Sequence, residues 1–254
     1  MHHRAHGASQ MARHSPDEPP ESRARQLAVQ VPVDGVILDG DLHIPGAATG
    51  LVVFAHGSGS SRHSPRNRGV ARYFNDRSLA TLLIDLLTTE EGRVDDVTRE
   101  LRFDIPLLAR RVAGAAVWCR GHEATRDLPL GLFGASTGAA AALVAAGELA
   151  EGIAAVVSRG GRPDLAGRAL PRVTAPTLLL VGSEDRQVLG LNELALAQLA
   201  CPAQLVTVEG ATHLFEEPGT LEEVARLAAD WFVRHFAPHA GNKGESPGAG
   251  HRGR

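Results

Sequence analysis

Cysteine is scarce in this sequence, which contains only Cys119 and Cys201 among its 254 residues. Two cysteines cannot supply a disulfide framework for a protein of this size, so we interpret both as small buried residues in a reducing compartment. Histidine and cysteine also lack the spacing that is typical of a metal site. We therefore expect a protein that uses no metal and no other cofactor.

Long apolar runs are also missing, and none approaches the roughly 18 residues that a membrane helix needs. The basic N-terminus is followed by no apolar segment, which argues against a secretory signal peptide, whether Met1 or Met11 begins the chain. Charge of one sign is not in excess, because 26 Lys and Arg face 29 Asp and Glu. A net charge of −3 argues against binding to nucleic acid or a membrane surface. We expect a cytoplasmic protein whose partner is a small molecule, in an oligomeric state that the sequence leaves open.

The two ends of the chain differ in composition from its middle. Residues 1–25 are rich in His, Arg, Pro and Ser, and residues 238–254 are rich in Gly and polar side chains. Such segments bury too little apolar surface to offset their ordering entropy, so we predict two disordered tails. Residues 26–237 are then expected to form one domain.

Hydrophobic periodicity changes along this domain. Leu27–Val33 and Val36–Ile44 alternate apolar and polar residues around Asp34-Gly35, the pattern of an antiparallel hairpin. Continuous apolar runs follow, and they predict buried strands at 51–55, 79–86, 130–133, 153–157, 177–181 and 204–208. Helices are expected at 65–75, 106–120, 139–146, 191–199 and 220–236, the last opened by a capping box at Thr220–Glu223, with a polar loop at 88–98. This alternation predicts an α/β fold with a mostly parallel central sheet, antiparallel N-terminal strands and helices on both faces.

The segment Gly134-Ala-Ser-Thr-Gly138 lies between a predicted strand and an alanine-rich helix. A serine flanked by glycines at a strand-to-helix turn is the pattern of a nucleophile elbow, which exposes the serine hydroxyl. The alternative is a glycine-rich turn in which the serine only caps the following helix, because such a turn can have the same pentapeptide sequence. The strand before the motif and the helix after it favour the nucleophile.

Three chemically complementary residues each follow a different predicted strand. Ser136, Asp185 and His213 should therefore lie at one edge of the sheet, in the order nucleophile, acid, base that is known for hydrolases of this architecture. An imidazole can take the serine proton near neutral pH, and a carboxylate can orient that imidazole. Glu184 is the alternative orienting carboxylate.

An acyl-transfer site also needs two backbone N–H groups that bind the oxyanion. Thr137, directly after the serine, is expected to supply one of them. The loop after the strand at 51–55 should supply the other, from Ser58 in the first place and Gly59 in the second.

These motifs resemble those of a known superfamily. The matching pieces are Phe54–Gly59, Gly134–Gly138, the loop at Asp185 and Gly210–His213. Together they look like an α/β-hydrolase, and within that superfamily the chain resembles dienelactone-hydrolase-like serine esterases over about residues 27–236. The resemblance favours Asp185 over Glu184, because Asp185-Arg-Gln-Val188 is similar to the acid loop of the family. Dienelactone hydrolases proper use a cysteine, whereas this chain has Ser136, so the resemblance implies cleavage of a small ester or lactone through an acyl-enzyme.

The segment between the strands at 153–157 and 177–181 has room for one short helix, so we expect minimal or no cap and an open site. Arginines crowd two of the loops at the predicted edge, and Arg62 and Arg159 are candidates for binding an anionic group of the substrate. The alternative is that the loop arginines are solvated, or paired with Glu90, Glu91 or Asp164.

Two other functions fit parts of the sequence. Gly57–Arg62 follows a strand, precedes a helix and is followed by Asp85, which resembles a dinucleotide-binding turn and its ribose-binding acid. However, Arg62 replaces the glycine that close helix packing requires, and this hypothesis leaves Ser136, Asp185 and His213 unexplained. The second alternative is a hydrolase fold retained as a non-catalytic binding protein.

Overall fold

The structure is a computed structural model that describes residues 24–237. The predicted tails lie outside the described residues, apart from Ala24 and Arg25 of the first tail, and Arg25 belongs to the first strand. Eight strands form one sheet in the order β1-β2-β4-β3-β5-β6-β7-β8. They are β1 (Arg25–Val33), β2 (Val36–Ile44), β3 (Gly50–Ala55), β4 (Leu79–Ile84), β5 (Leu130–Ala135), β6 (Ala155–Arg159), β7 (Thr177–Gly182) and β8 (Ala203–Val208).

The sheet is mostly parallel, as the sequence predicts. All neighbouring pairs from β4 through β3, β5, β6 and β7 to β8 are parallel, while β2 is antiparallel to both β1 and β4. The β1–β2 turn is the expected one, with positive φ at Asp34 and Gly35. The central strands β3, β4 and β5 are buried along their whole length, which explains why their sequences are apolar without alternation.

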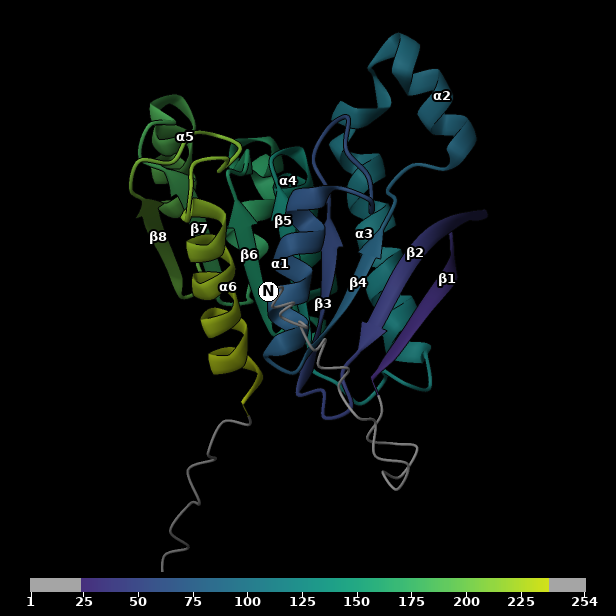
Figure 1. Ribbon diagram of the computed structural model, residues 1–254. Coiled ribbons are helices and arrows are strands. Elements are labelled where there is room, and N and C mark those ends of the chain that lie inside the picture. Colours follow the sequence, from purple (N-terminus) through teal and green to yellow (C-terminus); the bar gives the residue numbers. More distant parts are fainter. Residues whose placement is uncertain (1–23, 238–254) are drawn as a thin grey trace, which may run out of the picture.

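Helices cover both faces of the sheet (Figure 1). They are α1 (Pro65–Asp76), α2 (Thr89–Thr98), α3 (Ile105–Gly121), α4 (Thr137–Leu149), α5 (Arg186–Leu196) and α6 (Thr220–Phe236). The helices α3 and α4 pack on one face, in a cluster rich in Ala, Leu and Val. The helices α1 and α6 pack together on the other face, where Phe54, Phe74, Phe133 and Phe232 form a chain of aromatic contacts.

The carboxyl ends of the parallel strands lie together at the top of the view in Figure 1, with α2 above one side and α5 above the other. The strand register agrees with this, because Ala55 pairs with Gly134 and Ala135 pairs with Arg159. Loops that follow different strands therefore meet at one edge of the sheet, where open α/β sheets bind their ligands.

Two local predictions were wrong. Residues 88–98 form a helix rather than a loop, because Thr88 and Glu91 make a capping box and Asp95 holds the helix to Arg102. The expected capping box at α6 does not form. Gly219 occupies the N-cap position instead, and the Thr220 hydroxyl donates to the Glu217 carbonyl oxygen.

Glu91 joins α2 to the body of the protein. One of its carboxylate oxygens accepts from Arg111 Nη2 at 2.9 Å, and the other accepts from the Thr88 N–H. Arg111 is buried and also donates to the Val33 carbonyl oxygen at 3.0 Å. We expect Glu91→Ala to lower the free energy of unfolding by about 3 kcal/mol, because it leaves a buried guanidinium without its carboxylate.

Urea denaturation of Glu91→Ala and of Glu90→Ala measures this effect. Glu90 is exposed on the same turn of α2, so its variant is the matched control and should stay within about 0.5 kcal/mol of the parent. Equal midpoints for the two variants would contradict the role of the Arg111 ion pair.

Candidate active site

Ser136 occupies a strained turn between β5 and α4. Its φ is 51° and its ψ is −120°, a conformation that a residue with a Cβ rarely adopts. Ser136 is the N-cap residue of α4, yet its side chain makes no capping hydrogen bond there. The hydroxyl is therefore not used by the helix, as a nucleophile elbow requires.

The glycines around Ser136 are required by close packing. A Cβ at Gly138 would overlap the carbonyl oxygens of Ala55 and His56, and a Cβ at Gly134 would overlap the backbone of α4 at Ala139. The start of α4 can approach the end of β3 this closely only because Gly138 lacks a side chain, and it can approach β5 this closely only because Gly134 lacks one.

His213 and Asp185 are in direct contact. The Nδ1 atom of His213 lies 2.6 Å from Oδ2 of Asp185, and the Asp185 side chain is only 14% exposed. A carboxylate at this distance favours the proton on Nδ1, which leaves Nε2 free to accept one. The neighbouring Glu184 is exposed and lies near Ser183, so the structure pairs His213 with Asp185 rather than with Glu184.

Ser136 and His213 both lie against the end of β6. The Ser136 N–H donates to the Arg159 carbonyl oxygen at 3.2 Å. A Cβ placed on the next residue, Gly160, would lie 3.1 Å from the carbonyl oxygen of His213 and 3.6 Å from its Nδ1. Two segments that are far apart in the sequence, the turn at Ser136 and the loop at His213, therefore converge on the Arg159-Gly160 backbone.

The loop from Gly57 to Ser61 forms the other side of the turn. A Cβ on Gly57 would lie 3.1 Å from the Ser136 Cβ, so this loop passes directly beside the serine. Ser58, Gly59 and Thr137, the candidates for oxyanion binding, all line one cavity of about 280 Å³. Thr137 is the first residue of α4, and N–H groups at this position have no partner within their helix.

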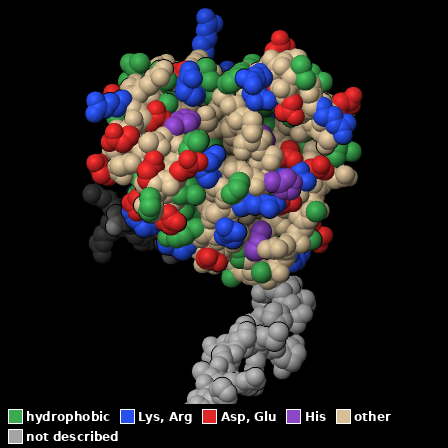
Figure 2. Space-filling view, turned by 45° about the horizontal axis from the view of Figure 1, so that its top comes forward, with side chains coloured by type: hydrophobic (Ala, Val, Ile, Leu, Met, Phe, Trp, Pro, Cys, Tyr) green, Lys and Arg blue, Asp and Glu red, His purple; other side chains and the backbone are tan. Residues whose placement is uncertain are grey.

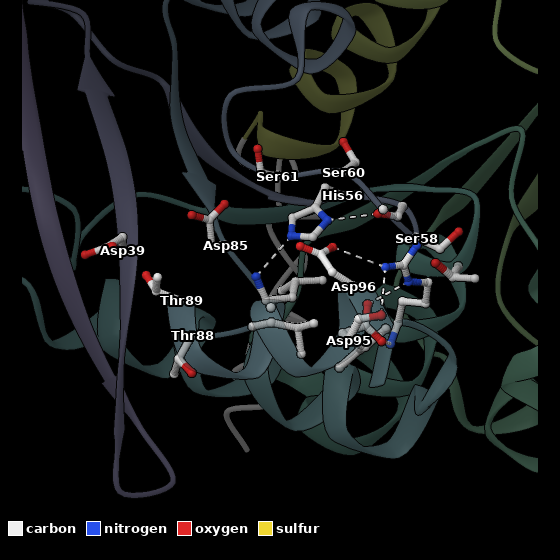
Figure 3. Close-up of a pocket in the computed structure, with 18 of the residues that line it drawn as sticks. Asp39, His56, Ser58, Ser60, Ser61, Asp85, Thr88, Thr89, Asp95 and Asp96 are labelled. Carbon is white, nitrogen blue, oxygen red and sulfur yellow. Dashed lines mark hydrogen bonds and ion pairs between the residues drawn. The ribbon is translucent and has the colours of Figure 1, made fainter. Parts of the chain in front are cut away.

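Sequence reasoning missed the outer wall of this cavity, which α2 and the following turn supply. Asp95, buried in α2, accepts from the backbone N–H and the Nε of Arg102, and the cavity lining also includes Thr88, Thr89 and Asp96 (Figure 3). The ten-residue helix α2 is polar, so its sequence shows no apolar periodicity that would predict a helix. The capping box formed by Thr88 and Glu91 could have been recognised from the sequence. Figure 2 shows this face hollowed, with charged side chains of both signs around the hollow.

His56, beneath the same cavity, has both ring nitrogens occupied. Its Nδ1 lies 2.9 Å from the Gly57 carbonyl oxygen, and its Nε2 accepts from the Leu86 N–H at 3.1 Å. Burial lowers the pKa of His56, outweighing the Gly57 carbonyl and the Asp85 charge, which raise it. The folded protein therefore holds a neutral imidazole that the unfolded chain would protonate first as the pH falls.

We expect this histidine to make stability depend on pH. The unfolded state binds the extra proton below its ordinary pKa of about 6.5, so the free energy of unfolding should decrease as the pH falls below that value, by at most about 1.4 kcal/mol per pH unit for one group. Urea midpoints of the parent and of His56→Gln between pH 7.5 and 5 test this. The decrease of the urea midpoint with falling pH should be smaller in His56→Gln than in the parent, and unchanged in the exposed control His63→Gln. An identical decrease in all three proteins would contradict the role of His56.

The two arginines that the sequence singles out lie in different surroundings. Arg62 donates from its backbone N–H and its guanidinium to Asp85, and it also lies within 3.9 Å of Asp39 and 3.7 Å of Asp41. Asp85, the acid of the dinucleotide hypothesis, is therefore already occupied by Arg62. Arg159 is buried, and its side chain forms no ion pair with any of residues 24–237.

The segment between β6 and β7 contains short 3₁₀ turns at Pro163–Arg172 and no long helix, as expected for a minimal cap. Among the described residues, no helix combines the length and apolar character needed to cross a bilayer. The same residues contain no cluster of three or more His, Cys, Asp or Glu side chains suited to a metal ion.

Comparison with known proteins decides the family. The chain is similar to the crystal structure of a dienelactone hydrolase from Anabaena variabilis, with 57% sequence identity and a TM-score of 0.83 over 84% of this chain and 99% of that one. The protein belongs to the dienelactone-hydrolase-like α/β-hydrolases. No family model matches the chain. More distant solved structures share the fold alone. They include Est1E from Butyrivibrio proteoclasticus (16% identity, TM-score 0.69, 83% of this chain and 99% of that one) and an α/β serine hydrolase without a lid from Xanthomonas campestris (20%, 0.67, 87% and 97%).

A curated relative of this dienelactone-hydrolase-like chain carries a different description. A Mycobacterium tuberculosis protein is 55% identical over 212 residues, and its printed name is "Putative phosphoribosyl transferase". The match covers 84% of this chain but 47% of that protein, so the chain spans about half the length of the curated relative. More than half of the relative thus has no counterpart in this match.

Proposed function

We propose that this protein is a serine hydrolase that cleaves a small carboxylic ester or lactone with Ser136, His213 and Asp185. The observation that carries the proposal is the strained turn at Ser136, set against the same backbone segment as a histidine that is hydrogen-bonded to an aspartate. A serine hydroxyl with no capping role, an imidazole with a free Nε2 and an orienting carboxylate are the parts that acyl transfer needs.

The mechanism has two steps. His213 Nε2 takes the proton of Ser136 Oγ as the oxygen attacks the ester carbonyl, and the Asp185 carboxylate stabilises the imidazolium that forms. His213 then gives this proton to the leaving alkoxide, which departs as the alcohol. Water, deprotonated by His213 in the same way, attacks the acyl-enzyme and releases the acid together with a free Ser136 hydroxyl.

Two backbone N–H groups are proposed to bind the oxyanion. Thr137 N lies at the positive end of α4, where the helix dipole favours a developing negative charge. Ser58 is the preferred second donor, because the Gly57 backbone before it is packed against Ser136. Gly59, whose φ is 66°, is the alternative in the same loop.

The cavity beside these donors favours a small substrate. Its volume of about 280 Å³ lies near the lower end of ordinary ligand pockets, which begin at about 300 Å³. The lining mixes aliphatic Leu86, Leu87 and Leu108 with serine, threonine and aspartate side chains. A short acyl chain fits this space better than a long lipid chain does.

The name of the curated relative gives a second candidate function, phosphoribosyl transfer, which we do not favour for this chain. The match covers about half of that protein, so the named activity can belong to the part that is not shared. Dinucleotide binding is also not favoured, because Asp85, the residue expected to bind the ribose, is paired with Arg62. Neither function gives a role to the contact between His213 and Asp185.

A fluorophosphonate probe tests the proposal. It should react with one residue of the folded protein, peptide mapping should locate it at Ser136, and hydrolysis of short aryl esters should stop as the label is incorporated. The variant His213→Ala should label at least about a hundredfold more slowly, because its serine has lost the base. Ester hydrolysis that continues at full rate after Ser136 is fully labelled would refute the assignment, and a protein that neither labels nor turns over any ester would be a non-catalytic member of the fold.

A further inference from the structure

Asn192 is a fully buried polar residue within α5. Its relative exposure is 0%, and its amide nitrogen donates to two backbone carbonyl oxygens. One belongs to Val188, on the preceding turn of the same helix, at 2.8 Å, and the other belongs to Gly161, at 3.0 Å. An asparagine amide has two N–H groups, so both donors are used. The second bond joins α5 to the segment of chain that follows β6.

The helix itself does not need this amide. The Val188 carbonyl oxygen is already the acceptor that α-helical geometry gives to the Asn192 backbone N–H, so the side chain adds only a second donor there. The Asn192 Oδ1 atom is buried and has no hydrogen-bond partner among residues 24–237, which is a cost to the folded state. The contact that an apolar residue could not replace is therefore the hydrogen bond to Gly161.

Gly161 belongs to a short segment that holds the backbone of Ser136. The Arg159 carbonyl oxygen accepts from the Ser136 N–H at 3.2 Å, and the Arg162 N–H donates to the Ser136 carbonyl oxygen at 3.1 Å. The residue before Gly161 lies against the backbone and the ring of His213. The path of residues 159–162 therefore sets where the proposed nucleophile lies relative to the proposed base.

The helix α5 also carries the proposed acid. Asp185 is its N-cap residue, the Asp185 side chain makes no capping hydrogen bond, and its Oδ2 atom lies 2.6 Å from His213 Nδ1. Asn192 follows about two helical turns later, so the two side chains lie on the same face of α5. A shift of the helix would move both residues together. The hydrogen bond from Asn192 to Gly161 thus connects the helix of the acid to the segment that holds the nucleophile.

We propose that Asn192 is a positioning residue for the reaction, which acts through the backbone at Gly161 and not through contact with the substrate. By holding the two supporting segments together, its amide fixes the place of Ser136 relative to the pair formed by His213 and Asp185. Misplacing a reacting group by about 1 Å can cost about a hundredfold in rate. The effect on the rate rests on the proposed function, whereas the effect on the geometry of the pair does not.

Steady-state kinetics of Asn192→Leu on short aryl esters test the proposal, because leucine keeps the branched shape and removes the donors. We expect kcat to fall at least about tenfold and KM to stay within about twofold of the parent, since Asn192 does not line the cavity beside the oxyanion donors.

Asn75→Leu is the matched control. The Asn75 amide nitrogen also donates to two acceptors, the Leu79 carbonyl oxygen and Thr81 Oγ1, both at 3.0 Å. These bonds lie at the start of β4, which is the opposite edge of the sheet from the proposed catalytic residues. The kcat of this variant should stay within about twofold of the parent.

Thermal unfolding of both variants separates positioning from a general loss of stability. Each variant loses two amide hydrogen bonds, so both melting temperatures should fall, while kcat should fall in Asn192→Leu alone. Equal kcat in folded Asn192→Leu and Asn75→Leu would overturn the proposal.

Asn192→Ser decides if Asn192→Leu does not fold. A serine hydroxyl can still bond the Val188 carbonyl oxygen on the preceding turn, but it is too short to reach Gly161. This variant should show the same loss of kcat. Failure of both variants to fold would reject the positioning role and leave the amide as a structural contact.

Proton NMR of the His213 Nδ1–H gives a readout that needs no activity, because the resonance of this proton reports its hydrogen bond to Asp185. Its chemical shift should change in Asn192→Leu and stay the same in Asn75→Leu. That result in a protein that hydrolyses no ester would support the positioning role while refuting the proposed esterase function. Full esterase activity in Asn192→Leu, with an unchanged proton resonance, would refute the positioning role and leave the proposed function intact.

Discussion

Ser136→Ala should lower kcat/KM for short aryl esters by at least about a thousandfold while leaving the protein folded. Removing the nucleophile of a serine hydrolase abolishes the acyl-enzyme route and leaves only what binding and the oxyanion donors contribute. The fold should tolerate the change because the Ser136 side chain makes no capping hydrogen bond and alanine fits the same space. Steady-state kinetics and thermal unfolding measure both effects.

Ser60→Ala is the control for this variant, because Ser60 lines the cavity beside the oxyanion donors but has no role in the proposed reaction. Its kcat/KM should remain within a few-fold of the parent value. If kcat/KM of Ser136→Ala equalled that of the Ser60→Ala control, another residue would be the nucleophile, and this result would contradict the proposed site.

Gly138→Ala should produce a large loss of stability, about 3 kcal/mol in the free energy of unfolding. The added Cβ would overlap the carbonyl oxygens of Ala55 and His56. Both atoms belong to the backbone at the end of β3, so they cannot move aside by a side-chain rotation. Either the helix α4 must shift away from β3, or the turn at Ser136 must open.

Chemical denaturation of Gly138→Ala beside Gly190→Ala measures this prediction. Gly190 lies within α5, where a Cβ would meet nothing within 4 Å, so Gly190→Ala should be neutral or stabilising by up to about 1 kcal/mol. Equal stability of the two variants would show that α4 packs less closely against β3 than the structure indicates. Loss of esterase activity in folded Gly138→Ala is also expected, because any shift of α4 displaces Ser136 and Thr137 together.

The sheet could be predicted from sequence because its central strands are apolar on both faces. Leu51–Ala55 and Thr177–Val181 read as buried strands and are buried strands in the structure. The Asp34-Gly35 turn was readable from its two residues, since few pairs accept positive φ at both positions. In these cases local chemistry and the global fold point to the same answer.

Two features of the helices were predicted wrongly, because the local sequence gave a weak or a misleading signal. The helix α2 carries few apolar residues, and ion pairs of Asp95 with Arg102 and of Glu91 with Arg111 hold it. The Thr220–Glu223 sequence has the letters of a capping box, yet the chain enters α6 through Gly219 and uses the Thr220 hydroxyl elsewhere. The local sequence could not reveal which of two chemically reasonable caps forms.

The same limit applies to the candidate site. Chain order and motif spacing predicted that Ser136, Asp185 and His213 lie at one edge of the sheet. Nothing in the loop sequences indicated that Arg62 would be paired with Asp85 while Arg159 would be buried without an acid. Side-chain pairing across loops depends on their folded path, which sequence pattern alone does not fix.

A crystal structure of the protein after reaction with a fluorophosphonate tests the central claim most directly. Phosphorus should be bonded to Ser136 Oγ, which replaces the fluoride, and one phosphonyl oxygen should lie within about 3 Å of the Thr137 N–H nitrogen and of a backbone nitrogen in the Gly57–Ser61 loop. His213 Nε2 should lie within about 3.2 Å of Ser136 Oγ or of the alkoxy oxygen of the phosphonate. An adduct on another residue would contradict the account, as would a His213 ring held away from Ser136 by a well-ordered loop.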